Sequence, residues 1–430
     1  MSRWLVLLAP LLALVAGATL AAERAPALTL EAVLAEAGAP HPDLDLARAQ
    51  QAAAQAEQEL AASLNDFRVT LEGTLGSGRN AYYDDRFHPN HQVRLNARKT
   101  LFDAGRLDTR LNAARDESAA RDLQLLDTRA QRRLTLMARF FDVLLADMQY
   151  AAETEFMATA YVSWDNAKDR LALGQMAQWE LAELDARYLD SLAGRNDVLR
   201  KLRDKRMQLA VALNRTETVR EDLVDPKLAG NERPLPELAP LLEVLFAHNP
   251  RLLAQKQLLT AARNRIEGVR ADNRPSLEFE AEAAAWSRES ITRDDLRAGV
   301  NFVWPLWQGG RVDARMAREQ ARFQELQARH DKLQLELRQT LADTWEEIQT
   351  LRNSERRGSE ANALYRDLAL EKARAEYELE LRTNLGASMA ETQSARLRKR
   401  AVEYRLALAL ARLEALLGTP LDALKVEEKK

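Results

Sequence analysis

The fold is decided by HQVRLNARKTLFDAGRLD at residues 91–108 and by its repeat LRAGVNFVWPLWQGGRVD at residues 296–313. Each stretch begins with alternating apolar and polar residues, passes through glycine, and ends where a long run without proline begins. The equivalent positions are Gly105 and Gly310 (205 residues apart), Gly174 and Glu380 (206 apart), and Leu209 and Leu413 (204 apart). An internal duplication on this scale predicts one elongated body built from two similar halves.

Four segments alternate between apolar and polar residues, about 66–77, 91–103, 276–287 and 296–307. A strand of about 9 to 11 residues with one apolar and one charged face is typical of a lipid-facing barrel around a wet lumen. The alternative, a soluble sheet whose apolar face lies on a core, stays open. Four strands cannot close a barrel, and open edges are not stable in hydrocarbon, so a membrane sheet of this kind requires several copies of the chain.

Long helices are expected after the second and fourth of these strands. Two helical hairpins are predicted, about 106–214 and 310–418, with turns at LGQMA (173–177) and LRTNLG (381–386). Shorter helices are expected over 28–38 and from Pro42 to about Ser63, and the segments GRNAYYDDRFHPN (78–90) and SRESITRDD (287–295) are expected as loops. The predicted fold class is therefore mainly α, with duplicated long antiparallel α-hairpins and two β-hairpins in each copy.

The chain divides into five parts by composition. An apolar core behind Arg3, followed by small residues, predicts a secretory signal peptide and hence an exported protein. A segment rich in proline and charge separates the halves. The predicted parts are 1–21 signal peptide, 22–215 first repeat, 216–240 connector, 241–420 second repeat and 421–430 C-terminal tail.

Composition and motifs argue against several function classes. The net charge of −3 gives no electrostatic case for nucleic acid, and the absence of cysteine excludes disulfides and cysteine-based metal sites. His88 and His91 lack a second cluster of metal ligands, and no nucleophile-elbow or phosphate-loop motif occurs. We therefore expect no enzyme, no cofactor and no metal.

The ordered set of features resembles the TolC-type outer-membrane efflux proteins (outer membrane factors) over nearly the whole mature sequence. The resemblance lies in the helix starts His41-Pro42 and Asn249-Pro250, the exits TLFDAGR and PLWQGGR, and the two hairpin turns. It implies a homotrimer with a 12-stranded β-barrel that continues as an α-helical periplasmic tunnel. The implied partners are a periplasmic adaptor (membrane fusion) protein, an inner-membrane pump and outer-membrane lipid, and the implied location is the outer membrane of a Gram-negative bacterium.

The resemblance also implies roles for single residues. Tyr377 and Arg382 match positions that close the periplasmic end, so they are the expected gate. The expected hairpin-turn residues are Gly174, Gln175, Thr383 and Asn384; the strand-to-helix exits are Gly105, Gly309 and Gly310; and the interfacial aromatic residues are Phe102, Trp304 and Trp307.

The expected function is a passive exit duct of a tripartite efflux pump, gated at its periplasmic helical tip. Two alternatives stay open. The first is the outer-membrane duct of a type I protein secretion system, which would have the same architecture. The second is a periplasmic coiled-coil scaffold or adaptor without a channel, which explains the helices and leaves the four alternating strands unexplained.

Overall fold

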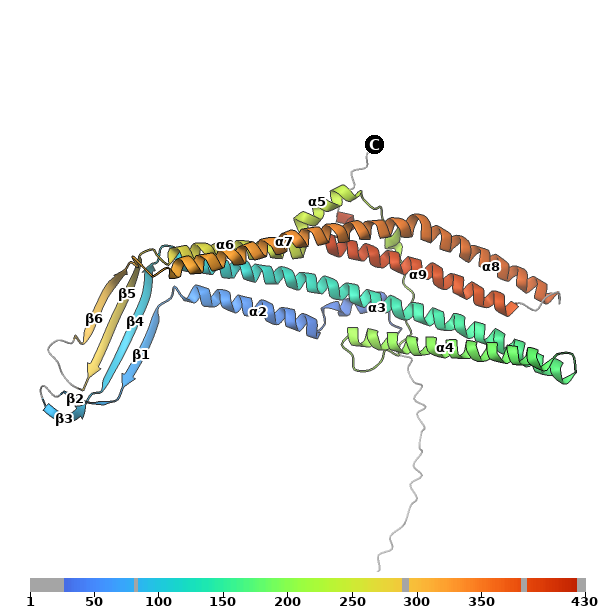
Figure 1. Ribbon diagram of the computed structural model, residues 1–430, viewed down its shortest axis with the longest axis horizontal. Coiled ribbons are helices and arrows are strands. Elements are labelled where there is room, and N and C mark those ends of the chain that lie inside the picture. Colours follow the sequence, from blue (N-terminus) through green and yellow to red (C-terminus); the bar gives the residue numbers. More distant parts are fainter. Residues whose placement is uncertain (1–26, 81–83, 288–293, 380–384, 424–430) are drawn as a thin grey trace, which may run out of the picture.

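The computed structural model describes residues 27–80, 84–287, 294–379 and 385–423. The molecule is long and mainly helical, with strands at one end and the tips of two helix pairs at the other (Figure 1). The expected signal peptide at 1–21 lies outside the described residues. Among the described residues, no helix has both the length and the apolar character needed to cross a membrane.

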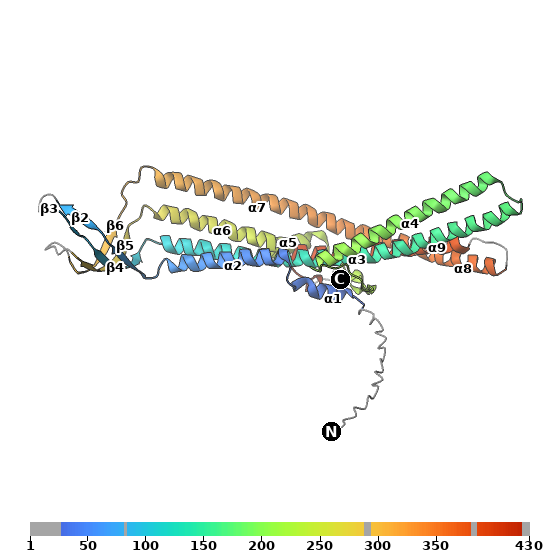
Figure 2. The ribbon, with the colours of Figure 1, turned by 90° about the horizontal axis from the view of Figure 1, so that it is seen from below.

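The helices follow the order expected for two similar halves. The first half has α1 (Leu30–Ala35), η1 (Glu36–Gly38), α2 (Pro42–Ser63), α3 (Arg106–Ala172) and α4 (Gln178–Ala212). The second has η2 (Ala229–Glu232), α5 (Leu238–His248), α6 (Pro250–Ala271), α7 (Arg311–Thr350), η3 (Leu351–Glu355), α8 (Arg356–Glu378), α9 (Leu385–Leu417) and η4 (Leu421–Ala423). α2 packs along α3 and α6 packs along α7, as the view in Figure 2 also shows.

Equivalent residues start α2 and α6. Pro42 and Pro250 occupy the first turn, where a missing N–H costs nothing because that group has no partner within the helix. His41 accepts a hydrogen bond at Nδ1 from the backbone N–H of Asp43 (3.2 Å), and the side-chain oxygen of Asn249 accepts one from Leu252 (3.0 Å). These caps satisfy N–H groups at each helix start, so the duplicated sequence signal has a duplicated structural cause.

The main sheet contains β1 (Arg68–Thr74), β4 (Gln92–Phe102), β5 (Ser276–Trp286) and β6 (Leu296–Val303) in the order β1-β4-β5-β6. All neighbours are antiparallel. The central pairing of β4 with β5 joins the two halves of the chain, with Gln92 opposite Trp286 and Lys99 opposite Phe279. β1 and β6 are the edges of the sheet, and neither has a second partner strand among the described residues.

Two expectations about the strands were wrong. The segment expected as a loop at 78–90 contains a second hairpin, β2 (Ser77–Asn80) with β3 (Asp84–Pro89). From Ser77 to Arg79 this hairpin keeps the register of the β1–β4 pairing, and the register shifts between Arg79 and Asn80. The segment lacks the apolar alternation that would have revealed it. β6 ends at Val303 rather than near 307, because Pro305 has no N–H to continue the ladder.

Two apolar clusters form the core, and α9 contributes to both. One cluster packs α1, α3 and α4 around Phe140, Phe141 and Tyr404. The other packs α5, α6, α7 and η3 around Leu341, Leu351 and Leu406 on the other side of α9. The core therefore lies about midway along the long axis of the molecule (Figure 1), a position here called mid-height, where the connector also crosses.

Candidate functional site

One face of the main sheet carries paired charges. Arg98 and Glu280 form a cross-strand ion pair (Nη2–Oε1 2.8 Å), and Asn301 donates a hydrogen bond to the other oxygen of Glu280 (2.8 Å). Arg297 lies 3.2 Å from Glu282 in the same way. The pairs link β4, β5 and β6, so this face is a polar surface in which most charges have a partner on the next strand.

The opposite face is apolar and exposed. Leu71 is 72% exposed and Leu296 75%, and no described helix packs substantially on the sheet. Its large exposed apolar residues include Phe67, Val69, Leu71, Val93, Leu95, Leu296, Val300 and Phe302. Contiguous exposed apolar surface of this kind marks contact with a membrane or another chain. A soluble sheet that covers this face with its own core is therefore not what the single chain forms.

Lys99 interrupts the apolar face. Its Nζ lies 4.9 Å from the ring centroid of Phe67, and Phe67 in turn contacts Phe279 edge to face at 6.3 Å between centroids. The ring partly compensates the charge through the cation–π attraction.

Glycines with positive φ mark both exits from strand to helix. Gly105 (φ 84°) precedes α3, while Gly309 (φ 62°) and Gly310 (φ 74°) precede α7. An L side chain is strained in this region, so glycine suits these turns, and Ala104 (φ 55°) accepts that strain at the position equivalent to Gly309. Asp103, which the sequence analysis did not single out, accepts hydrogen bonds from the N–H groups of Gly105 (3.1 Å) and Leu107 (2.7 Å).

The three expected interfacial aromatic residues lie near this junction of sheet and helices. Phe102 ends β4, whereas Trp304 and Trp307 follow β6. All three are exposed, at 51%, 56% and 88% respectively.

The turn of the first helical hairpin is a Schellman motif. Gly174 (φ 71°) donates to the carbonyl of Leu171 (2.9 Å), and Gln175 donates to that of Arg170 (2.8 Å). Glu180 then accepts from the N–H of Ala177 (2.8 Å) at the start of α4.

The second turn is described only on its flanks. Tyr377 lies in the last turn of α8 and is 53% exposed. Arg382, Thr383 and Asn384 of the expected gate and turn lie outside the described residues.

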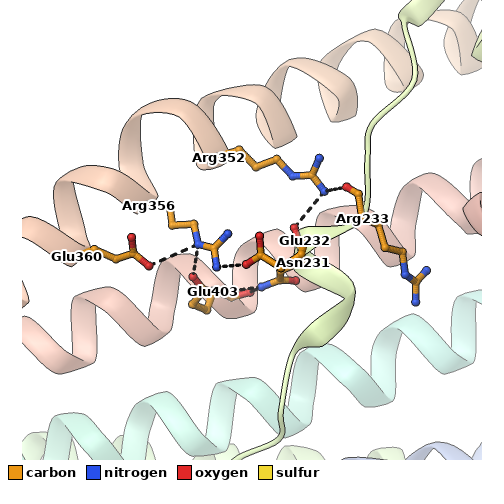
Figure 3. Close-up of polar contacts among 7 residues, drawn as sticks. All are labelled: Asn231, Glu232, Arg233, Arg352, Arg356, Glu360 and Glu403. Atoms are coloured by element: carbon orange, nitrogen blue, oxygen red, sulfur yellow. Dashed lines mark hydrogen bonds and ion pairs between the residues drawn. The ribbon is translucent and has the colours of Figure 1, made fainter. Parts of the chain in front are cut away.

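A polar cluster at mid-height escaped the sequence analysis. Its members are Asn231, Glu232, Arg233, Arg352, Arg356, Glu360 and Glu403, here called the connector cluster (Figure 3). Arg352 donates through Nη2 to the backbone carbonyls of Asn231 (3.1 Å) and Arg233 (2.6 Å). Burial lowers the pKa of Arg352 from its ordinary value.

The centre of the connector cluster is the buried carboxylate of Glu403 on α9. Asn231, itself 2% exposed, donates to Glu403 Oε2 (2.7 Å). Arg356 Nε lies 2.8 Å from Glu403 Oε1, and another guanidinium nitrogen bonds Glu232. That hydrogen bond to Glu232 raises the pKa of Arg356. The cluster therefore ties the connector to both helices of the second hairpin.

Within the described residues, no group of three or more histidine, aspartate or glutamate side chains could hold a metal ion. The comparisons with known proteins agree with the architecture. Residues 241–419 match the family described as outer membrane efflux protein. A 97-residue stretch is 37% identical to the pyoverdine export outer membrane protein OpmQ of Pseudomonas aeruginosa, covering 23% of this chain and 20% of that protein.

Solved structures match over most of the chain. VceC of Vibrio cholerae is 17% identical with a TM-score of 0.71, and the match covers 91% of this chain and 96% of VceC. The outer membrane channel MtrE of Neisseria gonorrhoeae is 17% identical (TM-score 0.73; 91% and 89% covered). The CmeC channel of Campylobacter jejuni is 14% identical (TM-score 0.74; 90% and 85% covered). The chain therefore shares its fold with these outer membrane channels, and its second half is similar to the outer membrane efflux protein family.

Proposed function

We propose that three copies of the chain form an exit duct through the outer membrane, with a 12-stranded barrel continued by a helical tunnel in the periplasm. The observation that carries the proposal is the main sheet, which has an exposed apolar face, a face of paired charges and two edge strands that pair with no further strand in the described part of the chain. Edges of this kind are not stable in hydrocarbon unless another copy pairs with them. Pairing β6 of one copy with β1 of the next would satisfy both edges.

The dimensions support a duct rather than an anchor alone. The 67 residues of α3 make a helix about 100 Å long, which is long enough to reach far from the sheet. A periplasmic adaptor and an inner-membrane pump would meet the helical end, and the energy for transport would come from that pump. The duct itself is passive.

The gate of this duct lies at the tip of the second hairpin. Arg382 is suited to a latch because its planar donor fork bonds carboxylates or carbonyls of a neighbouring helix. Tyr377, exposed on the last turn of α8, is the proposed second member of the latch. The cargo we propose is a small molecule, in line with the export role in the name of OpmQ.

Membrane extraction followed by native mass spectrometry tests the assembly. The protein should stay in the membrane through washes with salt and alkaline carbonate, come out in detergent, and appear with the mass of three copies. A periplasmic scaffold or adaptor would be released by the alkaline wash. Release in that wash, or a single copy in detergent, would contradict the proposal.

A further inference from the structure

The two long helices that follow the glycine exits differ in one respect. α3 runs through 67 residues without interruption. α7, η3 and α8 form one continuous helix in segments of 40, 5 and 23 residues, so this helix is one residue longer than α3. η3 is a π-helical turn, in which the N–H of Arg356 donates to the carbonyl of Leu351. Such a bond encloses one more residue than an α-helical bond, so the turn accommodates the extra residue.

The repeat offsets agree with an insertion at this place. The equivalent positions are 205 residues apart at Gly105 and Gly310, and 206 apart at Gly174 and Glu380. The extra residue therefore belongs to the second long helix only. π turns inside α-helices are rare and are found often at functional sites and kinks. The helix changes direction where α7 gives way to α8 (Figure 1).

Contacts hold this turn from three sides. Leu351 is fully buried in the apolar cluster at mid-height. Glu355 bonds Arg405 of α9 (2.7 Å). Arg352 and Arg356, which flank the remaining side of the turn, bond the connector as Figure 3 shows.

The need to join the two halves does not by itself require the connector to pass beside the π turn. Residues 216–240 join the halves and could take many paths over the surface, yet Asn231 is buried between α9 and the π turn. Its amide bridges to Glu403, the same carboxylate that pairs with Arg356. Removing Asn231 or Arg356 leaves the buried carboxylate of Glu403 without one of its partners, which is costly.

We propose that η3 is the hinge of the second hairpin and that the connector pins this hinge through Arg352 and Arg356. This inference rests on the proposed function, because it names the element about which the gate would move. α8 changes its direction relative to α7 and takes the adjoining part of α9 with it, whereas α3 and α4 have no such turn and stay in place. Gating is then confined to the second half of the duplicated chain.

The absence of native cysteine makes the test direct. Spin labels are placed on Gln178→Cys at the start of α4 and Arg374→Cys on α8, both at exposed positions. Labelled copies are mixed with an excess of unlabelled copies, so that the distances report the separation of the two hairpins within one copy. Distances are measured by double electron–electron resonance in the detergent-purified full chain. The test variant is Arg356→Gln. The matched control is Arg396→Gln, because Arg396 bonds Asp367 (2.9 Å) between the same two helices and does not touch the connector.

Arg356→Gln should shift the ratio of hairpin positions by at least about tenfold, because the charge-assisted contacts of Arg356 with Glu232 and Glu403 are lost. Arg396→Gln should leave the distance distribution as in the wild type. A wild-type distribution in Arg356→Gln, or an equal shift in the control, would overturn the proposal. If Arg356→Gln does not fold, Arg352→Gln decides by the same criteria, because it loses only its bonds to connector carbonyls. The distances need no ion flow, so a protein without channel activity would contradict the proposed function and still report on the hinge.

Discussion

Phe141 of α3 and Tyr404 of α9 stack face to face, with 4.5 Å between ring centroids and 3° between ring planes. The stack joins the first half of the chain to the second. The hydroxyl of Tyr404 also donates to Asp225 of the connector (2.7 Å). One side chain thus holds together both repeats and the segment between them.

Two substitutions of Tyr404 should destabilise the protein by different amounts. Tyr404→Phe keeps the stack and loses the hydrogen bond, which costs about 1 kcal/mol, whereas Tyr404→Ala also removes the buried ring and costs about 3–5 kcal/mol. Thermal unfolding followed by circular dichroism checks this order. Tyr365→Phe, at a residue 60% exposed, is the control and should unfold like the wild type. Equal midpoints for Tyr404→Phe and Tyr404→Ala would show that the stack contributes nothing.

The stability at high pH should depend on the same residue. Burial, followed by the hydrogen bond to Asp225, raises the pKa of Tyr404 above its ordinary value of about 10. The neutral phenol is therefore favoured in the folded state. Its contribution is fully present below about pH 10 and is lost as the pH rises toward the folded pKa. The stability difference between wild type and Tyr404→Phe should shrink above about pH 10; a constant difference up to pH 11 would contradict the pKa shift.

Alanine at the strand-to-helix exit should be costly, although nothing would clash with the new Cβ. Gly310 has open space around it and a φ of 74°, so Gly310→Ala is destabilising by about 1–2 kcal/mol through backbone strain alone. Gly194 is an exposed glycine inside α4, also with open space, and Gly194→Ala should instead stabilise by about 0.5–1 kcal/mol. Unfolding midpoints that move in the same direction would argue against the role of φ.

The charges on the polar face of the sheet should set the ion preference of the duct. Glu280→Gln removes the carboxylate that pairs with Arg98 and leaves a positive charge on the face proposed to line the lumen. Reversal potentials under a salt gradient should then shift toward anion preference. Glu267→Gln, in an exposed pair with Arg270 on α6, is the control. No shift in Glu280→Gln relative to this control would mean that the polar face does not line the conducting path.

The gate should loosen when the proposed latch is cut. Arg382→Ala removes the donor fork, and Tyr377→Phe removes only a hydroxyl, so the first should raise the open probability more than the second. Single-channel recordings of both variants beside the wild type check the order. Unchanged currents in Arg382→Ala would remove Arg382 from the gate and leave the duct itself in place.

The helices and strands that could be predicted are those marked by a pattern in their own sequence. Pro42 and Pro250 start helices because they sit in the first turn, and the alternation around Leu95 and Ala281 marks strands because one face is apolar. β2 and β3 carry no such alternation, and their pairing starts in the register of β1 and β4 before it shifts between Arg79 and Asn80.

The connector cluster could not be predicted from its own residues. Asn231, Arg356 and Glu403 are ordinary polar residues of a connector and two helices, and long-range packing brings them together. One signal in the sequence did indicate an irregularity in the second long helix. The repeat offset changes from 205 to 206, which requires an extra residue between Gly310 and Glu380. An offset gives the existence of an insertion but not its position along the helix.

The central claim is that the chain forms a gated duct, and single-channel conductance of the detergent-purified protein in a planar bilayer tests it most directly. A gated duct should insert into the bilayer and give small, mostly closed currents in discrete steps. Protein that is folded and detergent-extracted but never inserts or conducts would contradict it, and a periplasmic scaffold would then explain the helices better.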